Sequence, residues 1–245
     1  MKYIERIIVQ QLNKNFKIGF KRNQSALARL RDIFNRRFLK RNLHVLKDVS
    51  FNVFSGEILG IVGKNGCGKS TLLRILSGIY KDYEGNVKMN GKAIPIIGLG
   101  TGMQRRLTMG ENIFVVGSLF GMSFREIKKK FNLIVSFSGL ENYVDTKLFQ
   151  FSSGMLQRLA FSIAVHSNPD ILLLDEVFEV GDLDFRKKSA EKIKELAKKG
   201  GSVILVSHEL WMIEKYCKRA IWLDKGKINK IGKTNEVIKE YKKCG

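Results

Sequence analysis

The sequence predicts an α/β fold around a mainly parallel β-sheet. Short apolar runs alternate with segments of helical periodicity along most of the chain, which is the pattern of strand–helix–strand units. One of these runs, Ile171–Leu174, is continuously apolar, as a strand buried on both faces of a parallel sheet requires, and Ser202–Val206 is predicted as another buried strand. A chain of 245 residues with a hydrophobic fraction of 44% is also long enough to bury a sizeable core. We expect a single domain over residues 1–245.

Strands dominate the N-terminal part of the prediction. Four are expected in chain order, at Ile7–Leu12, Val49–Val53, Ile58–Val62 and, with a turn, Gly85–Lys92. A basic insertion over residues 17–44 separates the first two. Within it, Ser25–Lys40 places four apolar side chains on one helical face and four basic side chains mostly elsewhere; they are Leu27, Leu30, Phe34 and Phe38, and Arg29, Arg36, Arg37 and Lys40. We predict an amphipathic helix there.

Helices dominate the middle of the chain, where we expect a helical subdomain from about residue 109 to 166. Apolar positions recur at helical spacing from Ser123 to Leu140. A second helix is expected to begin near Ser152 and to end before Asn168-Pro169, because proline disfavours helix in the residue before it. The remaining predicted elements are a helix at Ala190–Lys199 and, after the strand Ser202–Val206, a further helix and then a hairpin around Asp224-Lys225-Gly226-Lys227.

The formal net charge of +21 is unevenly distributed. Between Lys14 and Lys47 there are eleven Lys or Arg residues and one acid, Asp32, so nearly half of the excess lies in this segment. Such a block faces nucleic acid, anionic lipid headgroups or an acidic partner. A merely solvated surface is the alternative, although apolar residues interleave with the charges.

Several classes of protein are excluded by composition. The three cysteines, Cys67, Cys217 and Cys244, form neither a disulfide framework nor a metal-binding pattern, which indicates a reducing cytoplasm. The longest stretch without charge, Asn112–Phe124, has 13 residues and is too short to cross a bilayer. An acid and a base, Glu5 and Arg6, interrupt the N-terminal segment, so we expect no signal peptide.

A glycine-rich segment after the strand Ile58–Val62 has the chemistry of a phosphate site. Gly63-Lys-Asn-Gly-Cys-Gly-Lys-Ser-Thr71 satisfies the P-loop pattern between a buried strand and a helix from about Lys69. Inward-facing backbone N–H groups and the positive end of the helix dipole attract an anion there. The nucleotide-binding candidates in this loop are Gly63, Asn65, Gly66, Cys67, Gly68, Lys69, Ser70 and Thr71. Lys69 is expected to reach the β- and γ-phosphates and Ser70 to ligate Mg²⁺.

The apolar strand Ile171–Leu174 is followed by two carboxylates. Asp175 is a candidate ligand for Mg²⁺ through water, and Glu176 is a candidate to orient or deprotonate the water that attacks the γ-phosphate. Acids often end strands, so the pair alone is a weak indication of a catalytic site. Beside a P-loop it is a strong one.

Together with these motifs, Phe151-Ser152-Ser153-Gly154-Met155 and Ser207-His208 resemble those of an ABC transporter nucleotide-binding domain. The resemblance covers almost the whole chain. It implies a P-loop NTPase fold with a RecA-like core, an antiparallel β subdomain and an inserted helical subdomain. It also implies a homodimer in which the signature helix of one subunit points its N-terminus at ATP held by the other subunit's P-loop.

The resemblance assigns roles to individual residues. Ser152, Ser153 and Gly154 would contact the partner's ATP, and Asp182 would communicate between subunits. Phe16 would stack on adenine, and His208 would contact the γ-phosphate as a catalytic residue. Core packing for Phe16 and a structural histidine for His208 are the alternatives.

Details of the motifs are similar to the subfamily that exports O-antigen, capsule and teichoic acid. The family's usual signature has a second Gly and a Gln where Ser153 and Met155 stand. Segments of the polysaccharide-exporter type are Ser152–Met155, Arg158–Ser162, Pro169–Val177, Val180–Asp182, Leu107–Ile113 and Arg219–Leu223. Two positions depart from the family pattern: Gln104, the one candidate for the Q-loop glutamine, lies too close to Leu107, and Glu179 stands where small residues are usual.

The resemblance therefore implies a homodimeric ATPase that uses ATP and Mg²⁺. It is expected as a peripheral protein at the cytoplasmic face of the membrane, beneath an integral-membrane permease present in two copies. The permease is expected to handle the lipid-linked glycan, and no C-terminal carbohydrate-binding domain is expected. An ABC ATPase for a drug or lipid is one alternative. The other is a soluble nucleic-acid-associated ABC protein, which the charge suits but which usually carries two cassettes; no nucleic acid is expected here.

Overall fold

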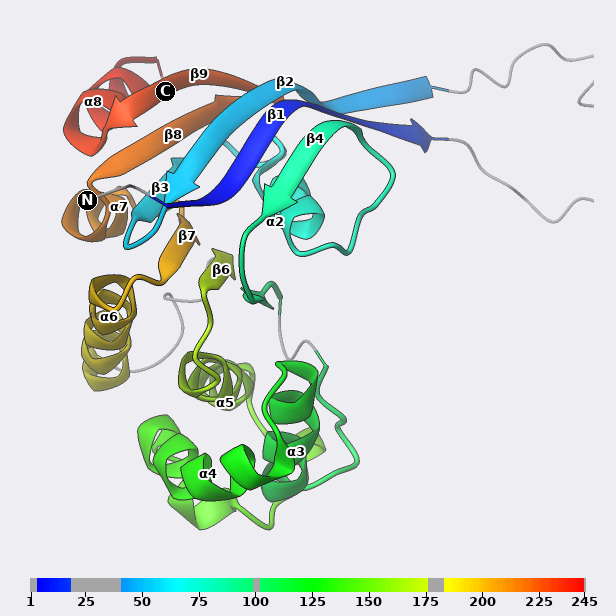
Figure 1. Ribbon diagram of the computed structural model, residues 1–245, viewed down its shortest axis with the longest axis vertical. Helices are drawn as coiled ribbons and strands as arrows, with labels where there is room; N and C mark the ends of the chain where they lie inside the picture. Colours follow the sequence, from blue (N-terminus) through cyan, green and yellow to red (C-terminus); the bar gives the residue numbers. More distant parts are fainter. Residues whose placement is uncertain (1–3, 19–40, 99–101, 176–182, 245) are drawn as a thin grey trace, which may run out of the picture.

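The computed structural model of the protein describes residues 4–18, 41–98, 102–175 and 183–244, and Figure 1 shows their arrangement. The predicted amphipathic helix at Ser25–Lys40 lies outside these ranges, as do Glu176, Glu179 and the segment Val180–Asp182. Within the four ranges, no helix has the length and apolar character needed to span a lipid bilayer.

Three strands form an antiparallel sheet: β1 (Glu5–Ile18), β2 (Arg41–Phe54) and β4 (Glu84–Met89), in the order β2-β1-β4. Both β1 and β2 extend well beyond the strands predicted from sequence. Their extensions contain several Asn and Lys residues, which have low strand propensity.

Side chains within the sheet compensate for irregular pairing between β1 and β2. Gln11 and Asp48 have left-handed φ values of 50° and 52° at register shifts. The backbone N–H of Gln11 donates to Ser50 Oγ at 2.8 Å, and that of Asp48 donates to Asn13 Oδ1 at 2.9 Å. These bonds satisfy backbone groups that the bulges leave without a cross-strand partner, so the strands continue through polar sequence.

A six-stranded sheet lies at the centre of the molecule. Its strands in sequence are β3 (Ile58–Val62), β5 (Ala93–Ile96), β6 (Ile171–Asp175), β7 (Ser202–Val206), β8 (Arg219–Asp224) and β9 (Lys227–Lys233). The spatial order is β5-β6-β7-β3-β8-β9, with every neighbouring pair parallel except β8 and β9. The α/β prediction is therefore confirmed.

The helices of the described residues are α2 (Lys69–Leu76), α3 (Met109–Leu119), α4 (Phe124–Ser138), α5 (Ser153–His166), α6 (Leu183–Lys198), α7 (Leu210–Tyr216) and α8 (Thr234–Cys244). Two 3-10 turns at Glu141–Tyr143 and Leu148–Gln150 lie between α4 and α5. Helix α6 begins seven residues before its predicted start, in charged sequence where Phe185 packs edge-on to Phe137 and Phe161. Helix α8, which was not predicted, buries Val237 and Ile238.

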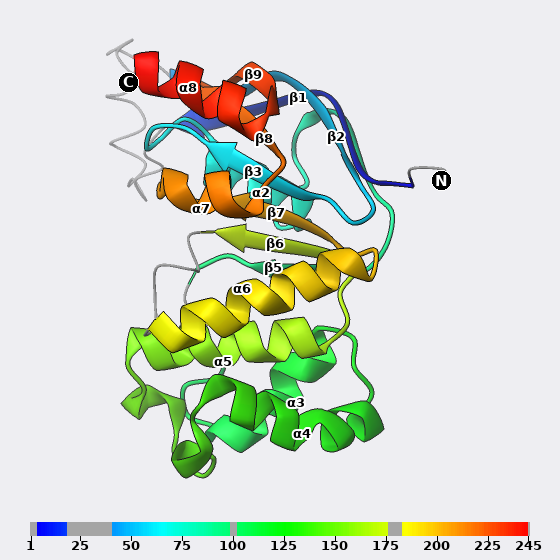
Figure 2. The same cartoon turned by 90° about the vertical axis from the view of Figure 1, so that its left-hand side faces the viewer.

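The central sheet is covered on both faces, as its apolar strands predict. On one face Val203 and Leu205 of β7 join a core with α5, α6, α7 and α8, which lie along this side in Figure 2. On the other face Ile204 and Val206 join a core with α2 and the three-stranded sheet. Every residue of β7 is buried, so the sheet is fixed between two packed layers.

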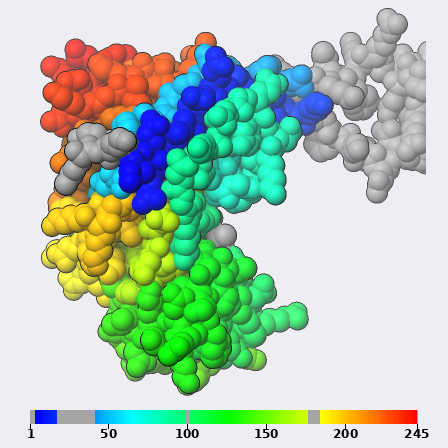
Figure 3. Space-filling model, in the orientation of Figure 1, coloured from blue at the N-terminus to red at the C-terminus, as the bar shows by residue number. Residues whose placement is uncertain are grey.

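A third core lies among α3, α4 and α5. Its fully buried members include Met109, Ile113, Ile127 and Leu159. Figure 3 shows the lobe of α3 and α4, in green, extending below the rest of the molecule. Helix α4 begins with a capping box, in which the backbone N–H and hydroxyl of Ser123 donate to the Glu126 carboxylate and lower the pKa of Glu126.

One fully buried side chain, Asn112, joins this lobe to the turn that enters it. Its Oδ1 accepts from the backbone N–H of Gln104 at 2.8 Å. Its Nδ2 donates to the carbonyls of Gln104 at 3.0 Å and Thr108 at 2.8 Å, with a longer contact of 3.3 Å to Leu107. The Asn112 amide thus adds to the backbone bonds of the turn, among them Leu107 N–H to the Gln104 carbonyl at 3.1 Å and Phe149 N–H to the Arg105 carbonyl at 2.9 Å.

Substitution of Asn112 by Ala is expected to destabilise the protein strongly. The change leaves the backbone N–H of Gln104 without its acceptor, at a cost of about 1–3 kcal/mol, and removes the second donor from the carbonyls of Gln104 and Thr108. The free energy of unfolding measured in urea should fall by about 2–4 kcal/mol. Asn86→Ala, at an exposed position of β4, is the matched control and should change it by less than about 0.5 kcal/mol. Equal urea midpoints for the two variants would contradict the role of Asn112.

Candidate nucleotide-binding site

The loop Gly63–Thr71 connects the central strand β3 to α2, and two of its glycines are required by close packing and backbone conformation. A Cβ on Gly63 would lie 2.1 Å from the carbonyl oxygen of Leu223. Gly68 is the N-cap residue of α2 with a φ of 115°, which residues with a side chain rarely adopt. A larger residue at either position would move the loop.

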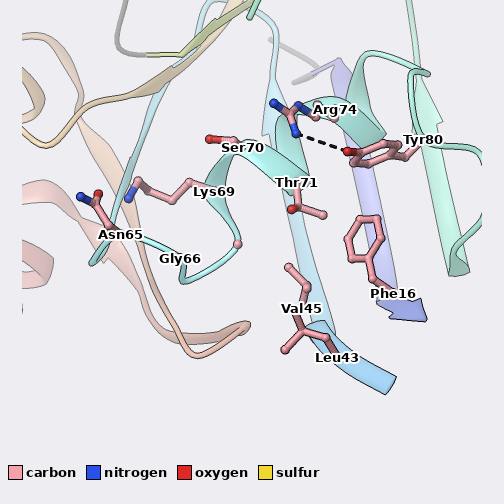
Figure 4. A pocket seen from close by; sticks show the side chains of 11 residues that line it. Phe16, Leu43, Val45, Asn65, Gly66, Lys69, Ser70, Thr71, Arg74 and Tyr80 are labelled. Atoms are coloured by element: carbon pink, nitrogen blue, oxygen red, sulfur yellow. Dashed lines mark hydrogen bonds between the residues drawn. The ribbon is translucent and has the colours of Figure 1, made fainter. Parts of the chain in front are cut away.

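Lys69 begins α2 and its side chain is buried inside this loop. Its Nζ donates to the carbonyl oxygens of Gly63 at 2.7 Å and Lys64 at 3.2 Å. The ammonium is therefore held against the loop at the N-terminal end of α2, on the side of Asn65 in Figure 4. A positive charge and a helix N-terminus at one point are what an anion such as a phosphate prefers.

The turn between β8 and β9 supports the loop from the other side. The N–H of Gly226 donates to the carbonyl of Cys67 at 3.0 Å, and its own carbonyl accepts from the N–H of Lys47 at 2.8 Å. Cys67 itself is buried, and burial raises the pKa of its thiol. Cys67 therefore fills space in the loop as a neutral thiol.

A cavity of about 410 Å³ adjoins the loop, within the usual size range of ligand sites. It is lined by Phe16, Leu43, Val45, Asn65, Gly66, Gly68, Lys69, Ser70, Thr71, Arg74 and Tyr80. The structure thus brings Phe16, from β1, to the same cavity as the P-loop (Figure 4). One end of this cavity is apolar and aromatic, and the other is lined by backbone and the Lys69 ammonium. That arrangement suits a base at one end and phosphates at the other.

Four of these residues were not singled out in the sequence. Leu43 is the cross-strand partner of Phe16, and Val45 lies at a register shift of β2 between His44 and Leu46. These two residues were not recognised because the strands predicted from the sequence do not extend to them. Arg74 follows Ser70 by four positions, so helical periodicity alone places both on one face of α2.

Asp175 and His208 lie at the same edge of the central sheet as the P-loop. Val206 of β7 pairs with Asp175 of β6 on one side and with Ile61 of β3 on the other. His208 follows β7 by two residues and has a side chain 53% exposed. Because these three strands are parallel neighbours, their carboxyl ends meet, which is where α/β proteins bind ligands.

The donor set at this edge fits Mg²⁺. In the described part of the chain no cluster of three or more His, Cys, Asp or Glu residues is suited to hold a metal ion. Mg²⁺ needs no such cluster, because it keeps several waters and takes one or two carboxylates together with substrate phosphates. The Ser70 hydroxyl and Asp175 carboxylate are hard oxygen donors of this kind.

The signature residues are in another part of the chain. Ser152 caps α5, accepting the N–H of Met155 at 3.2 Å, and Ser152 and Ser153 are exposed. Figure 1 places α5 with α3 and α4, whereas the cavity is lined by β1, β2, the P-loop, α2 and Tyr80. The α5 N-terminus is thus available to a ligand outside this subunit's own cavity.

Other predicted site residues are only partly described. Glu176 and Asp182 lie outside the described residues. Gln104 has an exposed side chain on the turn held by Asn112, four residues before the capped start of α3 at Thr108. Its role as a Q-loop glutamine stays a prediction.

Known proteins share both the sequence and the fold. The family model described as "ABC transporter" matches residues 46–179. The chain is 38% identical to the O-antigen export system ATP-binding protein RfbB of Myxococcus xanthus, over 81% of this chain and 46% of that protein. It is 41% identical to the teichoic acids export ATP-binding protein TagH of Lactococcus lactis, over 83% of this chain and 44% of that protein. The chain thus spans less than half the length of these two relatives.

The fold also has close counterparts among solved structures. A dimeric ATP-binding cassette in a post-hydrolysis state, bound to ADP and Pi, superposes with a TM-score of 0.76. The match covers 93% of this chain and 98% of that one at 24% identity, which supports the fold. The P-loop, the carboxyl edge of the sheet, the family match and the relatives agree, and the chain belongs to the ABC transporter family as an ATP-binding domain.

Proposed function

We propose that the chain is the ATP-hydrolysing subunit of an ABC exporter and that it moves a lipid-linked polysaccharide through a separate permease. The observation that carries the ATPase part is the cavity beside the P-loop. It unites the buried Lys69 ammonium, the N-terminus of α2 and the aromatic ring of Phe16. This arrangement suits a nucleoside triphosphate bound by its base and phosphates together.

Dimerisation follows from the separation of the signature helix from this cavity. The α5 N-terminus offers free backbone N–H groups beside the exposed Ser152 and Ser153. A second copy in antiparallel orientation brings that end to the triphosphate held by the first. Two Mg-ATP molecules would then lie between the two subunits, and residues of both chains would form each ATP site.

The chemistry rests on residues at the carboxyl edge of the sheet. Lys69 neutralises charge on the β- and γ-phosphates, and His208 contacts the γ-phosphate. Glu176 follows Asp175 directly and holds the attacking water, accepting its proton. Ser70 and Asp175 would hold Mg²⁺, which would supply further neutralisation of phosphate charge.

Polysaccharide is the favoured cargo because the relatives named above are an O-antigen and a teichoic acid export protein. The signature Ser152–Met155 agrees with this subfamily. A drug or lipid cargo has no comparable support. The permease carries the glycan, while the ATPase supplies the cycle of closure and reopening.

A peripheral position at the cytoplasmic face of the membrane follows from this partnership. The basic segment over residues 17–44 would help, since each cation near an anionic surface contributes about 1 kcal/mol. Most of this segment lies outside the described residues.

The variant Glu176→Gln is expected to bind ATP but turn it over about 100-fold or more slowly, because an amide cannot accept the proton. It should accumulate as an ATP-bound dimer in size-exclusion chromatography. Glu191→Gln, at an exposed position of α6, is the control and should behave as wild type. Near-normal steady-state hydrolysis by Glu176→Gln would exclude this residue as the base.

Mixing two inactive variants tests the composite site. A heterodimer of Lys69→Ala and Gly154→Asp subunits has one intact composite site and one doubly damaged site. Weak ATPase activity should therefore appear in the mixture and in neither homodimer. Full activity of the Gly154→Asp homodimer would show that the signature helix does not contact nucleotide.

Export itself is tested in cells whose only copy carries Lys69→Ala. Glycan should remain detectable in whole-cell lysate while antibody labelling of the cell surface is lost. Normal surface labelling would argue against a role in polysaccharide export and leave the ATPase assignment in place.

A further inference from the structure

The aromatic end of the cavity is a corner made by two rings. Phe16 projects from β1, and Tyr80 lies in the loop between α2 and β4. Their ring centroids are 5.5 Å apart with an interplanar angle of 73°, an edge-to-face arrangement. Both rings line the cavity and both are half-buried (Figure 4).

Tyr80 is fixed to α2 through a single residue, Arg74. The N–H of Tyr80 donates to the Arg74 carbonyl at 3.1 Å, and Nη1 of Arg74 donates to the Tyr80 hydroxyl at 3.2 Å. The guanidinium carbon also lies 5.9 Å from the Tyr80 ring centroid. The carbonyl of Arg74 thus holds the backbone of Tyr80, and its guanidinium holds the Tyr80 hydroxyl.

A second contact from the same loop reaches Phe16. Lys14 is buried, and its Nζ lies 4.8 Å from the centroid of the Phe16 ring. That ammonium donates to the backbone carbonyl of Asp82 and lies 3.4 Å from its carboxylate. The loop following α2 therefore restrains Phe16 from two directions, through Tyr80 and through Lys14.

We propose that Tyr80 is a positioning residue for the nucleotide base, which holds Phe16 in the orientation that stacks and is itself locked by Arg74. This rests on the proposed nucleotide-binding function. Without such a contact, a half-buried phenylalanine near the end of β1 would have to be ordered by the base itself, which reduces affinity.

The arrangement also couples binding of the base to binding of the phosphates. Arg74 lies on α2, the helix whose first turn carries Lys69 and Ser70. Base stacking and phosphate binding therefore share one rigid element, through the chain of contacts Phe16, Tyr80 and Arg74. Tyr80 is absent from the motifs read in the sequence, and its position follows from the loop geometry.

The test compares Tyr80→Leu with wild type for two ligands, MgATP and inorganic Mg-tripolyphosphate, which has no base. Loss of one aromatic pair weakens an interaction by about 0.5–1.5 kcal/mol, or about 2- to 12-fold in a binding constant. Calorimetry should therefore show the Kd for MgATP rising about three- to tenfold while the Kd for tripolyphosphate stays within about twofold. Tyr83→Leu, a half-buried tyrosine three residues along the same loop, is the matched control and should leave both values unchanged.

A double substitution separates positioning from direct contact. In a Phe16→Leu background, Tyr80→Leu should cause little further loss of MgATP affinity, because its effect passes through the missing ring. The conservative variant Tyr80→Phe keeps the ring and should restore most of the affinity lost in Tyr80→Leu.

Three results would overturn the proposal. The first is an unchanged Kd for MgATP in Tyr80→Leu, and the second is an equal rise in the Kd for tripolyphosphate. The third is that Tyr80→Leu weakens MgATP binding as much in the Phe16→Leu background as it does in the wild type. Wild-type protein that bound neither ligand would overturn the nucleotide-binding function itself. Normal binding by wild type with no effect of Tyr80→Leu would overturn only the positioning role.

Discussion

The site depends on how closely the backbone of the P-loop packs against its neighbours. At Gly63 there is no space for a side chain, because the Leu223 carbonyl lies where a Cβ would be. Gly226 then bonds to Cys67 on one side and Lys47 on the other. Loop, β8–β9 turn and β2 thus form one backbone unit, and both the phosphate end and the base end of the cavity are built on it.

The central sheet supplies the rest of the alignment. Because β3, β6 and β7 are parallel neighbours, the residues that follow these three strands lie close together at one edge of the sheet. Full burial of β7 between two cores fixes that edge. Helices α3 and α4 pack in a core of their own, and α5, which carries the signature residues at its N-terminus, contributes both to that core and to the core on the central sheet.

The sequence was sufficient to predict an element where the local pattern of apolar residues and glycines alone determines its position. The strands Ile58–Val62 and Ser202–Val206 were predicted to the residue, and α2 was expected from about Lys69, where it begins. Leu43, Val45 and Tyr80 were not recognised, because their places depend on β-bulges and on a loop closed by Arg74. Such features arise from pairing between distant segments, which propensity cannot reveal.

The distribution of the three thiols has a practical consequence for following this protein in solution. Cys67 and Cys217 are buried, and burial raises the pKa of each, so at neutral pH neither presents a thiolate to an alkylating reagent. Cys244 is exposed at the end of α8. A maleimide fluorophore should therefore attach to the unmodified chain at one position, remote in sequence from the P-loop, and report subunit association by energy transfer without any engineered cysteine.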